Sequence, residues 1–150
     1  MREIMPQQLT AFTFVVRDYD EAILYFTGNL GFELIEDTPL GGGKRWVRVR
    51  PADSAGPDLL LARASSPEQE SRIGNQAGGR VLLFLETDDL NRDYETWGTR
   101  GVQFTETPRE EPYGRVVVFE DLYGNRWDLI ERRGARLPHG PPAKQAPHTP

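Results

Sequence analysis

Apolar and polar positions follow the same order twice along this chain. Residues 14–32 and 84–102 each pass from an apolar, strand-like run through an acidic turn into a stretch with helical spacing. Each stretch ends at a glycine that begins a second strand, and 13 residues separate Asp18 from Gly31, as they do Asp88 from Gly101. Two similar units 70 residues apart predict a duplicated module with a site between the halves.

The periodicity predicts the order β-α-β-β-β in each module, an α+β architecture. Strands are expected at 9–17, 32–37, 45–50 and 58–63, with a helix at 19–30, in the first module (9–64). The second module (80–131) is expected to contain strands at 81–87, 102–107, 116–120 and 126–130 and a helix at 90–100. Residues 65–79 are predicted to be a flexible linker, and 39–43 and 107–115 to be loops.

Composition narrows the class of protein. A net charge of −5 argues against nucleic acid as a partner, because such binding depends on Lys and Arg neutralising phosphates. No apolar run approaches the roughly 20 residues that span a bilayer, and residues 1–8 lack the apolar core of a signal peptide. The absence of cysteine removes disulfides and thiolate chemistry. We therefore expect a cytoplasmic protein that binds neither nucleic acid nor membrane.

The C-terminal segment differs from the rest of the chain. Residues 132–150 are rich in proline and poor in apolar residues, so a disordered tail is predicted after a domain at 1–131. The two histidines, His139 and His148, both lie in this segment. A metal site built on imidazole in the folded core is therefore not expected.

Several motifs resemble those of the vicinal oxygen chelate superfamily, which includes glyoxalase I, bleomycin-resistance proteins and extradiol dioxygenases. They lie at 16–18, 25–32, 87–90, 100–102 and 119–131, and the last of them, FEDLYGNRWDLIE, is the most specific. The resemblance implies two tandem βαβββ modules that form a cup-shaped mixed sheet. It also implies a homodimer, as in the bleomycin-resistance branch.

The resemblance further implies where metal ligands would lie. The four positions of the metal-dependent members fall on Ala11, on Leu60 or Asp58, on Leu82 or Arg80, and on Asp128. Divalent metals in such sites need three or more nitrogen or oxygen donors. Alanine, leucine and arginine supply none, so neither a metal nor another cofactor is expected, and glyoxalase or dioxygenase chemistry is placed in doubt.

Arg80 and Asp128 form the first candidate site. If both point into the cleft, a cross-strand pair stands where a metal would be, and the guanidinium holds an anionic or carbonyl-bearing ligand. The alternative is that the pair only neutralises itself, or that Arg80 is solvated. Asp128 is also a candidate catalytic base, which a buried carboxylate could become.

Other ligand contacts are expected from aromatic and basic positions. Trp46 and Arg48 share one strand face with Arg50, which suits a planar acidic molecule, although a solvated arginine-rich face would look the same. Phe84 is counted among the aromatic residues of the cleft. Tyr113 and Arg115 come from the loop at 107–115, which either closes over the ligand or is an ordinary charged hairpin.

These observations favour a small-molecule-binding protein of the resistance or sequestration type, which holds a hydrophobic or aromatic compound without a metal. A metal-free lyase or isomerase with Asp128 or a glutamate as base is the first alternative. A metal-dependent lactoylglutathione lyase or extradiol dioxygenase is the second. An interaction module without any ligand is the third.

Overall fold

The computed structural model describes residues 6–134. The predicted tail beyond Gly134, with His139 and His148, lies outside the described residues. The chain divides between Ile73 and Gly74 into two compact units, and each is described by itself. No helix within the described range is long and apolar enough to cross a bilayer.

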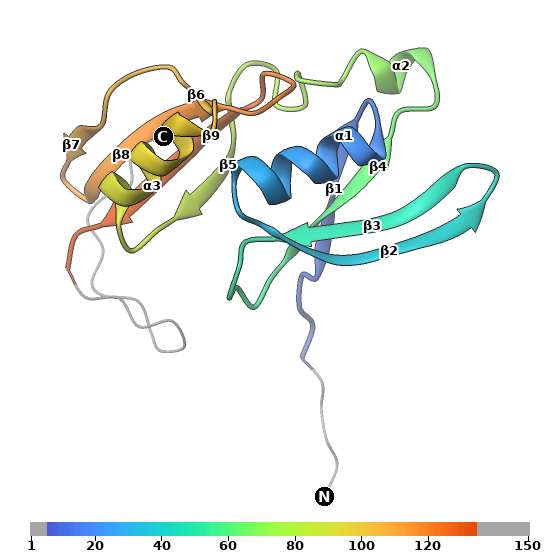
Figure 1. Cartoon of the computed structure of the whole chain (residues 1–150), viewed down its shortest axis with the longest axis horizontal. Helices are drawn as coiled ribbons and strands as arrows, with labels where there is room; N and C mark the ends of the chain where they lie inside the picture. Colours follow the sequence, from blue (N-terminus) through green and yellow to red (C-terminus); the bar gives the residue numbers. More distant parts are fainter. Residues whose placement is uncertain (1–5, 135–150) are drawn as a thin grey trace, which may run out of the picture. The chain divides into compact units, whose positions relative to one another are not determined.

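The first unit contains a four-stranded sheet in the order β1-β4-β3-β2 (Figure 1). Strand β1 pairs in parallel with β4, and the β4–β3 and β3–β2 pairs are antiparallel. The four strands are β1 (Ala11–Val16), β2 (Glu33–Gly41), β3 (Lys44–Arg50) and β4 (Asp58–Arg63).

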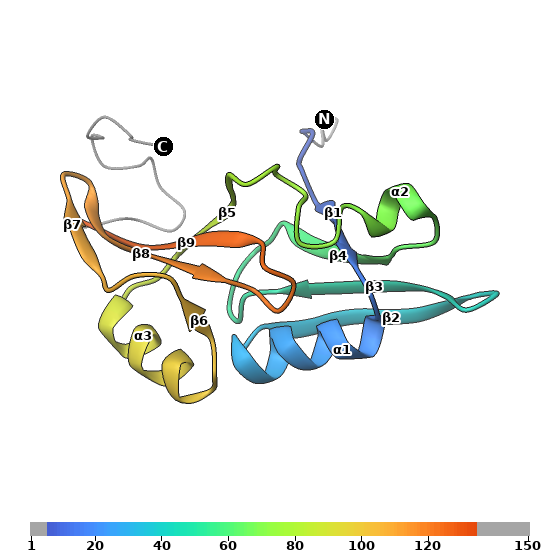
Figure 2. The ribbon, with the colours of Figure 1, turned by 90° about the horizontal axis from the view of Figure 1, so that it is seen from above.

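One helical segment covers one face of this sheet. Helix α1 (Tyr19–Leu24) begins after Asp18, whose carboxylate accepts the backbone N–H of Glu21 at 2.8 Å as an N-cap, and a π turn at Tyr25–Asn29 continues it. The ring of Phe26 in this turn meets Phe14 of β1 edge to face, with centroids 5.4 Å apart. Figure 2 shows α1 along one side of the sheet. Because side chains alternate along each strand, every second side chain lies on the face away from α1.

The second unit repeats this plan. Its sheet has the order β5-β9-β8-β6, with β7 also paired to β8. The elements are β5 (Val81–Glu86), α3 (Leu90–Thr99), β6 (Gln103–Phe104), β7 (Arg109–Glu111), β8 (Gly114–Glu120) and β9 (Arg126–Arg132). The α+β architecture with a mixed sheet in each βαβββ-like unit is therefore confirmed, since β5 and β9 are parallel and β8 and β9 antiparallel.

Aromatic side chains fix which face of this second sheet meets its helix. Trp97 of α3 lies edge to face with Phe119, and Phe119 stacks on Trp127 at 5.4 Å between centroids. Trp127 was expected on the helix side, and its contacts confirm this. Because side chains alternate along a strand, Asp128 then lies on the sheet face away from α3.

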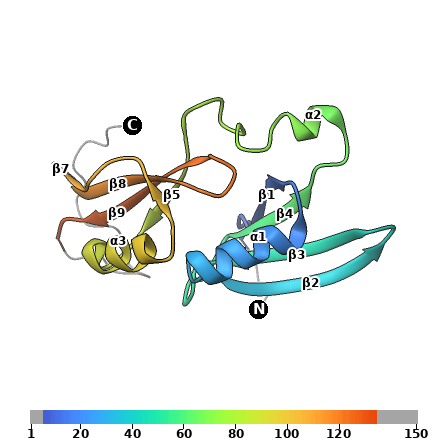
Figure 3. The same cartoon turned by 45° about the horizontal axis from the view of Figure 1, so that its top comes forward.

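The structure differs from several of the predicted segments. Strand β2 continues through Pro39 and Leu40, where a loop was expected, because the turn that reverses the chain is limited to the glycines that follow. The expected linker contains a short helix, α2 (Pro67–Glu70), capped by Ser66 (Figure 3). The expected loop at 107–115 holds β7 and the start of β8, which form a hairpin. Strand β9 extends to Arg132, into the predicted tail.

Candidate functional site

The face of the first sheet that points away from α1 carries the polar candidates of that unit. Along β3, Val47 and Val49 are fully buried on the helix side, whereas Trp46, Arg48 and Arg50 alternate onto the other side. Trp46 is 40% exposed. The shared face predicted for these residues is confirmed.

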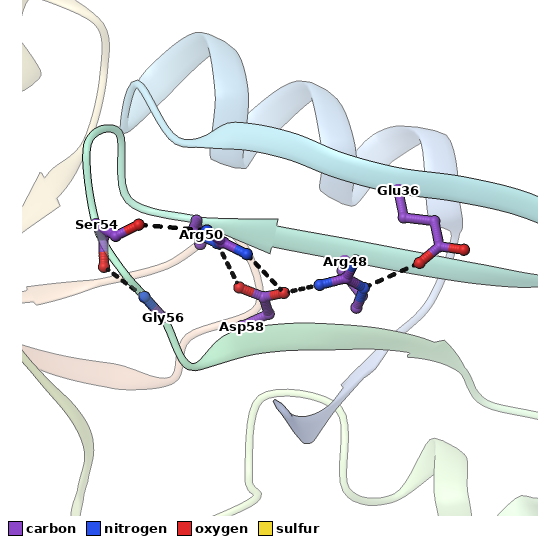
Figure 4. Close-up of polar contacts among 6 residues, drawn as sticks. All are labelled: Glu36, Arg48, Arg50, Ser54, Gly56 and Asp58. Atoms are coloured by element: carbon purple, nitrogen blue, oxygen red, sulfur yellow. Dashed lines mark hydrogen bonds and ion pairs between the residues drawn. The ribbon is translucent and has the colours of Figure 1, made fainter. Parts of the chain in front are cut away.

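A buried carboxylate organises the two arginines (Figure 4). Asp58, at the start of β4, is 1% exposed and accepts hydrogen bonds from Nη1 of Arg48 and from Nε of Arg50, the latter at 2.6 Å. Arg48 also donates from Nε to Glu36 Oε1 at 3.1 Å, and Arg50 donates from Nη1 to the carbonyl oxygen of Ser54 at 3.3 Å. We call these four side chains, Glu36, Arg48, Arg50 and Asp58, the arginine–carboxylate cluster.

The cluster fixes the charge of Arg48. Desolvation by burial works to lower its pKa, but hydrogen bonds to Glu36 and Asp58 outweigh that effect, so the pKa of Arg48 is raised. Arg48 and Arg50 are therefore held by carboxylates, which differs from the alternative of a merely solvated arginine-rich face. From the sequence, Asp58 was expected only as a possible metal ligand. Its place on the strand after one with alternating arginines could have indicated that it pairs with them.

The corresponding face of the second sheet carries Phe84 and Asp128. The two residues are neighbours in the parallel β5–β9 register, and Val118 of β8 lies on the other side of Asp128. Phe84 is 52% exposed, whereas Asp128 is 5% exposed. An exposed aromatic ring thus stands beside a buried carboxylate, both away from α3.

Arg80 does not lie beside Phe84 and Asp128. It is exposed and lies just before β5, whose register begins with Val81 opposite Arg126 and is shifted before Leu83. The register places Phe84, not Arg80, beside Asp128, and Arg80 precedes the first paired residue of β5, so the predicted Arg80–Asp128 pair was wrong. The alternative of a solvated Arg80 fits its exposure.

Tyr113 and Arg115, the two candidate residues of the hairpin formed by β7 and β8, lie on different sides of the second sheet. Tyr113 is buried and packs with Val116 and Ile130, which share the face of Asp128. Arg115 donates to Asn91 Oδ1 of α3 at 2.6 Å and pairs with Glu110 at 2.9 Å. Arg115 therefore belongs to the helix side, away from Phe84 and Asp128.

Tyr113 has an altered acidity. Burial raises the pKa of its phenol, and the negative charges of Glu111 and Asp128 act in the same direction, while Arg109 and Arg132 oppose them. The phenol consequently stays protonated near neutral pH and can donate a hydrogen bond. Ion pairs flank this region, between Arg132 and Glu86 at 2.5 Å and between Arg109 and Glu111 at 3.2 Å.

A third buried carboxylate, Asp121, stabilises a turn. Burial raises its pKa, although hydrogen bonds from Trp127, Tyr123 and Asn125 work to lower it. Its Oδ2 accepts the indole N–H of Trp127 at 2.9 Å, and its Oδ1 accepts the backbone N–H of Tyr123 at 2.9 Å. These bonds fix the turn between β8 and β9, so the raised pKa of Asp121 does not mark a catalytic base.

The metal that the resemblance implies does not fit these residues. In the first unit, Ala11 lies opposite Asp58 in the β1–β4 register, and Asp58 is already held by two guanidiniums. In the second unit, the neighbour of Asp128 is Phe84. Among residues 6–134, no group of three His, Cys, Asp or Glu side chains could hold a metal ion.

The chain is similar in sequence to known proteins. A sequence model of the Glyoxalase/Bleomycin resistance protein/Dioxygenase superfamily matches residues 8–129. An uncharacterized protein of Shewanella frigidimarina is 56% identical over 128 residues, which is 85% of this chain and 95% of that protein.

Solved structures agree with this match. The crystal structure of UcmS2 is similar at a TM-score of 0.73 and 28% identity, covering 84% of this chain and 98% of that one. TnmS3, an antibiotic binding protein from Streptomyces sp. CB03234, is similar at a TM-score of 0.66 and 27% identity, covering 87% of this chain and all of that one.

Proposed function

This chain belongs to the Glyoxalase/Bleomycin resistance protein/Dioxygenase superfamily, and we propose that within it the chain binds a hydrophobic or aromatic small molecule without a metal ion. The observation that carries the proposal is an exposed aromatic side chain on the helix-free face of each sheet, Trp46 in the first and Phe84 in the second. An exposed aromatic ring offers apolar contact area and a face on which the ring of an organic ligand can stack.

The polar groups beside these rings support the same function. Arg48 lies two residues from Trp46 on β3, and the phenol of Tyr113 is near enough to Asp128 for the carboxylate to raise its pKa. A few fixed polar groups among apolar ones are what small-molecule sites use to orient a ligand. TnmS3, which is similar over most of this chain, is an antibiotic binding protein, and this likeness supports binding or sequestration of a toxic compound.

The absence of a fitting donor set among residues 6–134 supports binding without metal. A guanidinium pair neutralises Asp58, and a carboxylate so held is a poor ligand for a second cation. The metal-dependent lyase and dioxygenase alternatives are therefore disfavoured, because their chemistry needs several converging donors.

The proposal is tested by a thermal-shift screen with planar aromatic compounds on one side and Zn²⁺, Ni²⁺, Mn²⁺ and Fe²⁺ on the other. A compound that binds the native state raises its melting temperature. We expect shifts with aromatic compounds that shrink in Trp46→Ala or Phe84→Ala. Arg80→Ala is the matched control, because Arg80 is exposed and lies outside both faces. Stabilisation by metals alone would overturn the proposal.

A metal-free lyase or isomerase is the second candidate, and the burial of Asp128 beside Tyr113 favours it. A carboxylate in such surroundings can act as a general base, with the phenol as a hydrogen-bond donor. This enzyme would lose turnover in Asp128→Asn while the variant still binds its substrate. Equal loss of binding and turnover would assign Asp128 to ligand contact instead.

Two further expectations belong to this proposal. A homodimer is predicted, and light scattering coupled to size-exclusion chromatography would measure its mass against the 17.0 kDa chain. A cytoplasmic location is also predicted, and fractionation of cells that produce the protein would test it.

A further inference from the structure

Arg48 offers a hydrogen-bond donor that is held in a fixed direction. Its Nε is bonded to Glu36 and its Nη1 to Asp58, so two of its three nitrogens are fixed to different carboxylates. Within residues 6–134, Nη2 makes no hydrogen bond, and the side chain is 26% exposed. A guanidinium held in this way loses little entropy when it binds a further acceptor.

The neighbours of Arg48 on the same sheet face are also donors. Trp46 lies two residues along β3, about 7 Å away, and within the described chain its indole N–H has no hydrogen-bond partner. Thr13 of β1 and Arg48 of β3 both lie opposite Leu60 of β4, so the three strands bring them to one face. The hydroxyl of Thr13 likewise has no partner among the described residues.

The acceptors at the centre of this face are already occupied. Asp58 accepts from both arginines, and Glu36 accepts from Arg48 and from the hydroxyl of Thr38 at 3.1 Å. A ligand that rests on Trp46 and Leu60 therefore meets donors that lack acceptors, and an acceptor oxygen on the ligand would satisfy them.

The charges on this face indicate that the oxygen need not be ionised. Three cations and three anions share the face: Lys44, Arg48, Arg50, Glu33, Glu36 and Asp58. Their formal charges cancel, so the groups on this face together favour neither an anion nor a cation. Selectivity then depends on hydrogen bonding at short range, and not on net charge.

From these contacts we infer that the face formed by Trp46, Arg48, Leu60 and Thr13 binds a planar aromatic carbonyl compound. The aromatic rings stack on Trp46, and the carbonyl oxygen accepts a hydrogen bond from Nη2 of Arg48. This inference rests on the proposed function and adds to it the chemical class of the ligand and the unit that recognises it.

Two probes of nearly the same shape test the inference. 2-Acetylnaphthalene carries a carbonyl oxygen, and 2-isopropenylnaphthalene carries a methylene group in its place. A hydrogen bond from a charged donor is worth enough to make the ketone about 10-fold tighter than the alkene. Isothermal titration calorimetry on the full chain measures both dissociation constants, and the ketone's affinity should change little between low and high salt.

Variants locate the effect. Arg48→Met should abolish the preference for the ketone, whereas Trp46→Ala should weaken both probes by similar factors. Lys44→Met is the matched control, because Lys44 is an exposed cation on the same strand and face, and the preference should survive it. If Arg48→Met does not fold, the ratio of the dissociation constants of the two probes for the unaltered protein still tests the inference.

Equal affinities for the two probes, or no binding of the ketone, would overturn the inference. Binding of the alkene in either case would leave the proposed function intact, because that proposal requires an aromatic ligand and not a carbonyl. A ketone preference that persists in Arg48→Met would also overturn the role given to Arg48.

Discussion

Arg50 holds Asp58 through both carboxylate oxygens, with Nε 2.6 Å from Oδ1 and Nη2 3.5 Å from Oδ2. Arg48 reaches the same carboxylate from the next position on its strand face. The first sheet therefore carries its positive charge as two fixed guanidiniums, at a place where the family resemblance implies a metal ligand.

Removing the carboxylate should destabilise the fold. Asp58→Ala would leave two partly buried guanidiniums without their shared acceptor, and breaking such a pair costs about 3 kcal/mol of the free energy of unfolding. Urea denaturation measures this cost. Glu36→Gln is the control, because Glu36 is more exposed and its amide can still accept from Arg48, so its loss should stay under about 1 kcal/mol. Equal losses would contradict the organising role of Asp58.

Asp121 should give a measurable pH dependence. Burial raises the folded-state pKa of Asp121 above its ordinary value of 3.8, so the folded chain keeps this proton to a higher pH than the unfolded chain does. The contribution of Asp121 to stability is therefore fully present below pH 3.8 and is lost as pH rises through the folded pKa. The free energy of unfolding of the unaltered protein, minus that of Asp121→Asn, should therefore fall as pH rises through that window. A difference that rises with pH would contradict this assignment.

Gly114 should not tolerate a side chain. It has φ of +149°, and an added Cβ would lie 2.1 Å from the carbonyl oxygen of Glu131. Gly114→Ala should therefore cost about 1–3 kcal/mol from backbone strain alone, with the steric clash in addition. Gly98→Ala, in helix α3 with nothing within 4 Å of the added atom, should be neutral or stabilising. Thermal denaturation of both variants compares them directly.

Substitutions of Phe84 and Phe119 should separate binding from stability. Phe84→Ala removes a ring that is half exposed, so we expect a change in melting temperature of only a few degrees but a clear loss of affinity for aromatic compounds. Phe119→Ala is the contrasting variant, since Phe119 is fully buried between Trp97 and Trp127 and should lose about 3–5 kcal/mol. Unchanged affinity in Phe84→Ala would show that this face of the second sheet does not bind these compounds.

The fold was largely predictable because apolar periodicity and turn residues repeat in both modules. The strand at Asp58–Arg63 was predicted to the residue, since Pro57 precedes it and a charged residue stands at each end of a short apolar run. Strand β7 was missed because Arg109–Glu111 is entirely charged and is recognised only by its pairing with β8.

The candidate site was less predictable, because it depends on register. Alternation correctly placed Trp46, Arg48 and Arg50 on one face, but the identity of their partner required the pairing of β3 with β4. The pairing of Arg80 with Asp128 failed because β5 begins to pair with β9 only at Val81, and Phe84 lies opposite Asp128. The apolar pattern of a strand that reads Val-Leu-Leu-Phe-Leu does not show which residue of the neighbouring parallel strand lies opposite each position.

The most direct test of the central claim is the effect of metal on ligand affinity. The aromatic compound that gives the largest thermal shift would be titrated calorimetrically into protein dialysed against EDTA, and again after addition of Zn²⁺, Ni²⁺ or Mn²⁺. We predict the same dissociation constant in every case, because guanidiniums and aromatic rings make the contacts. A loss of affinity of about 10-fold or more on chelation, restored by one of these metals, would contradict the account.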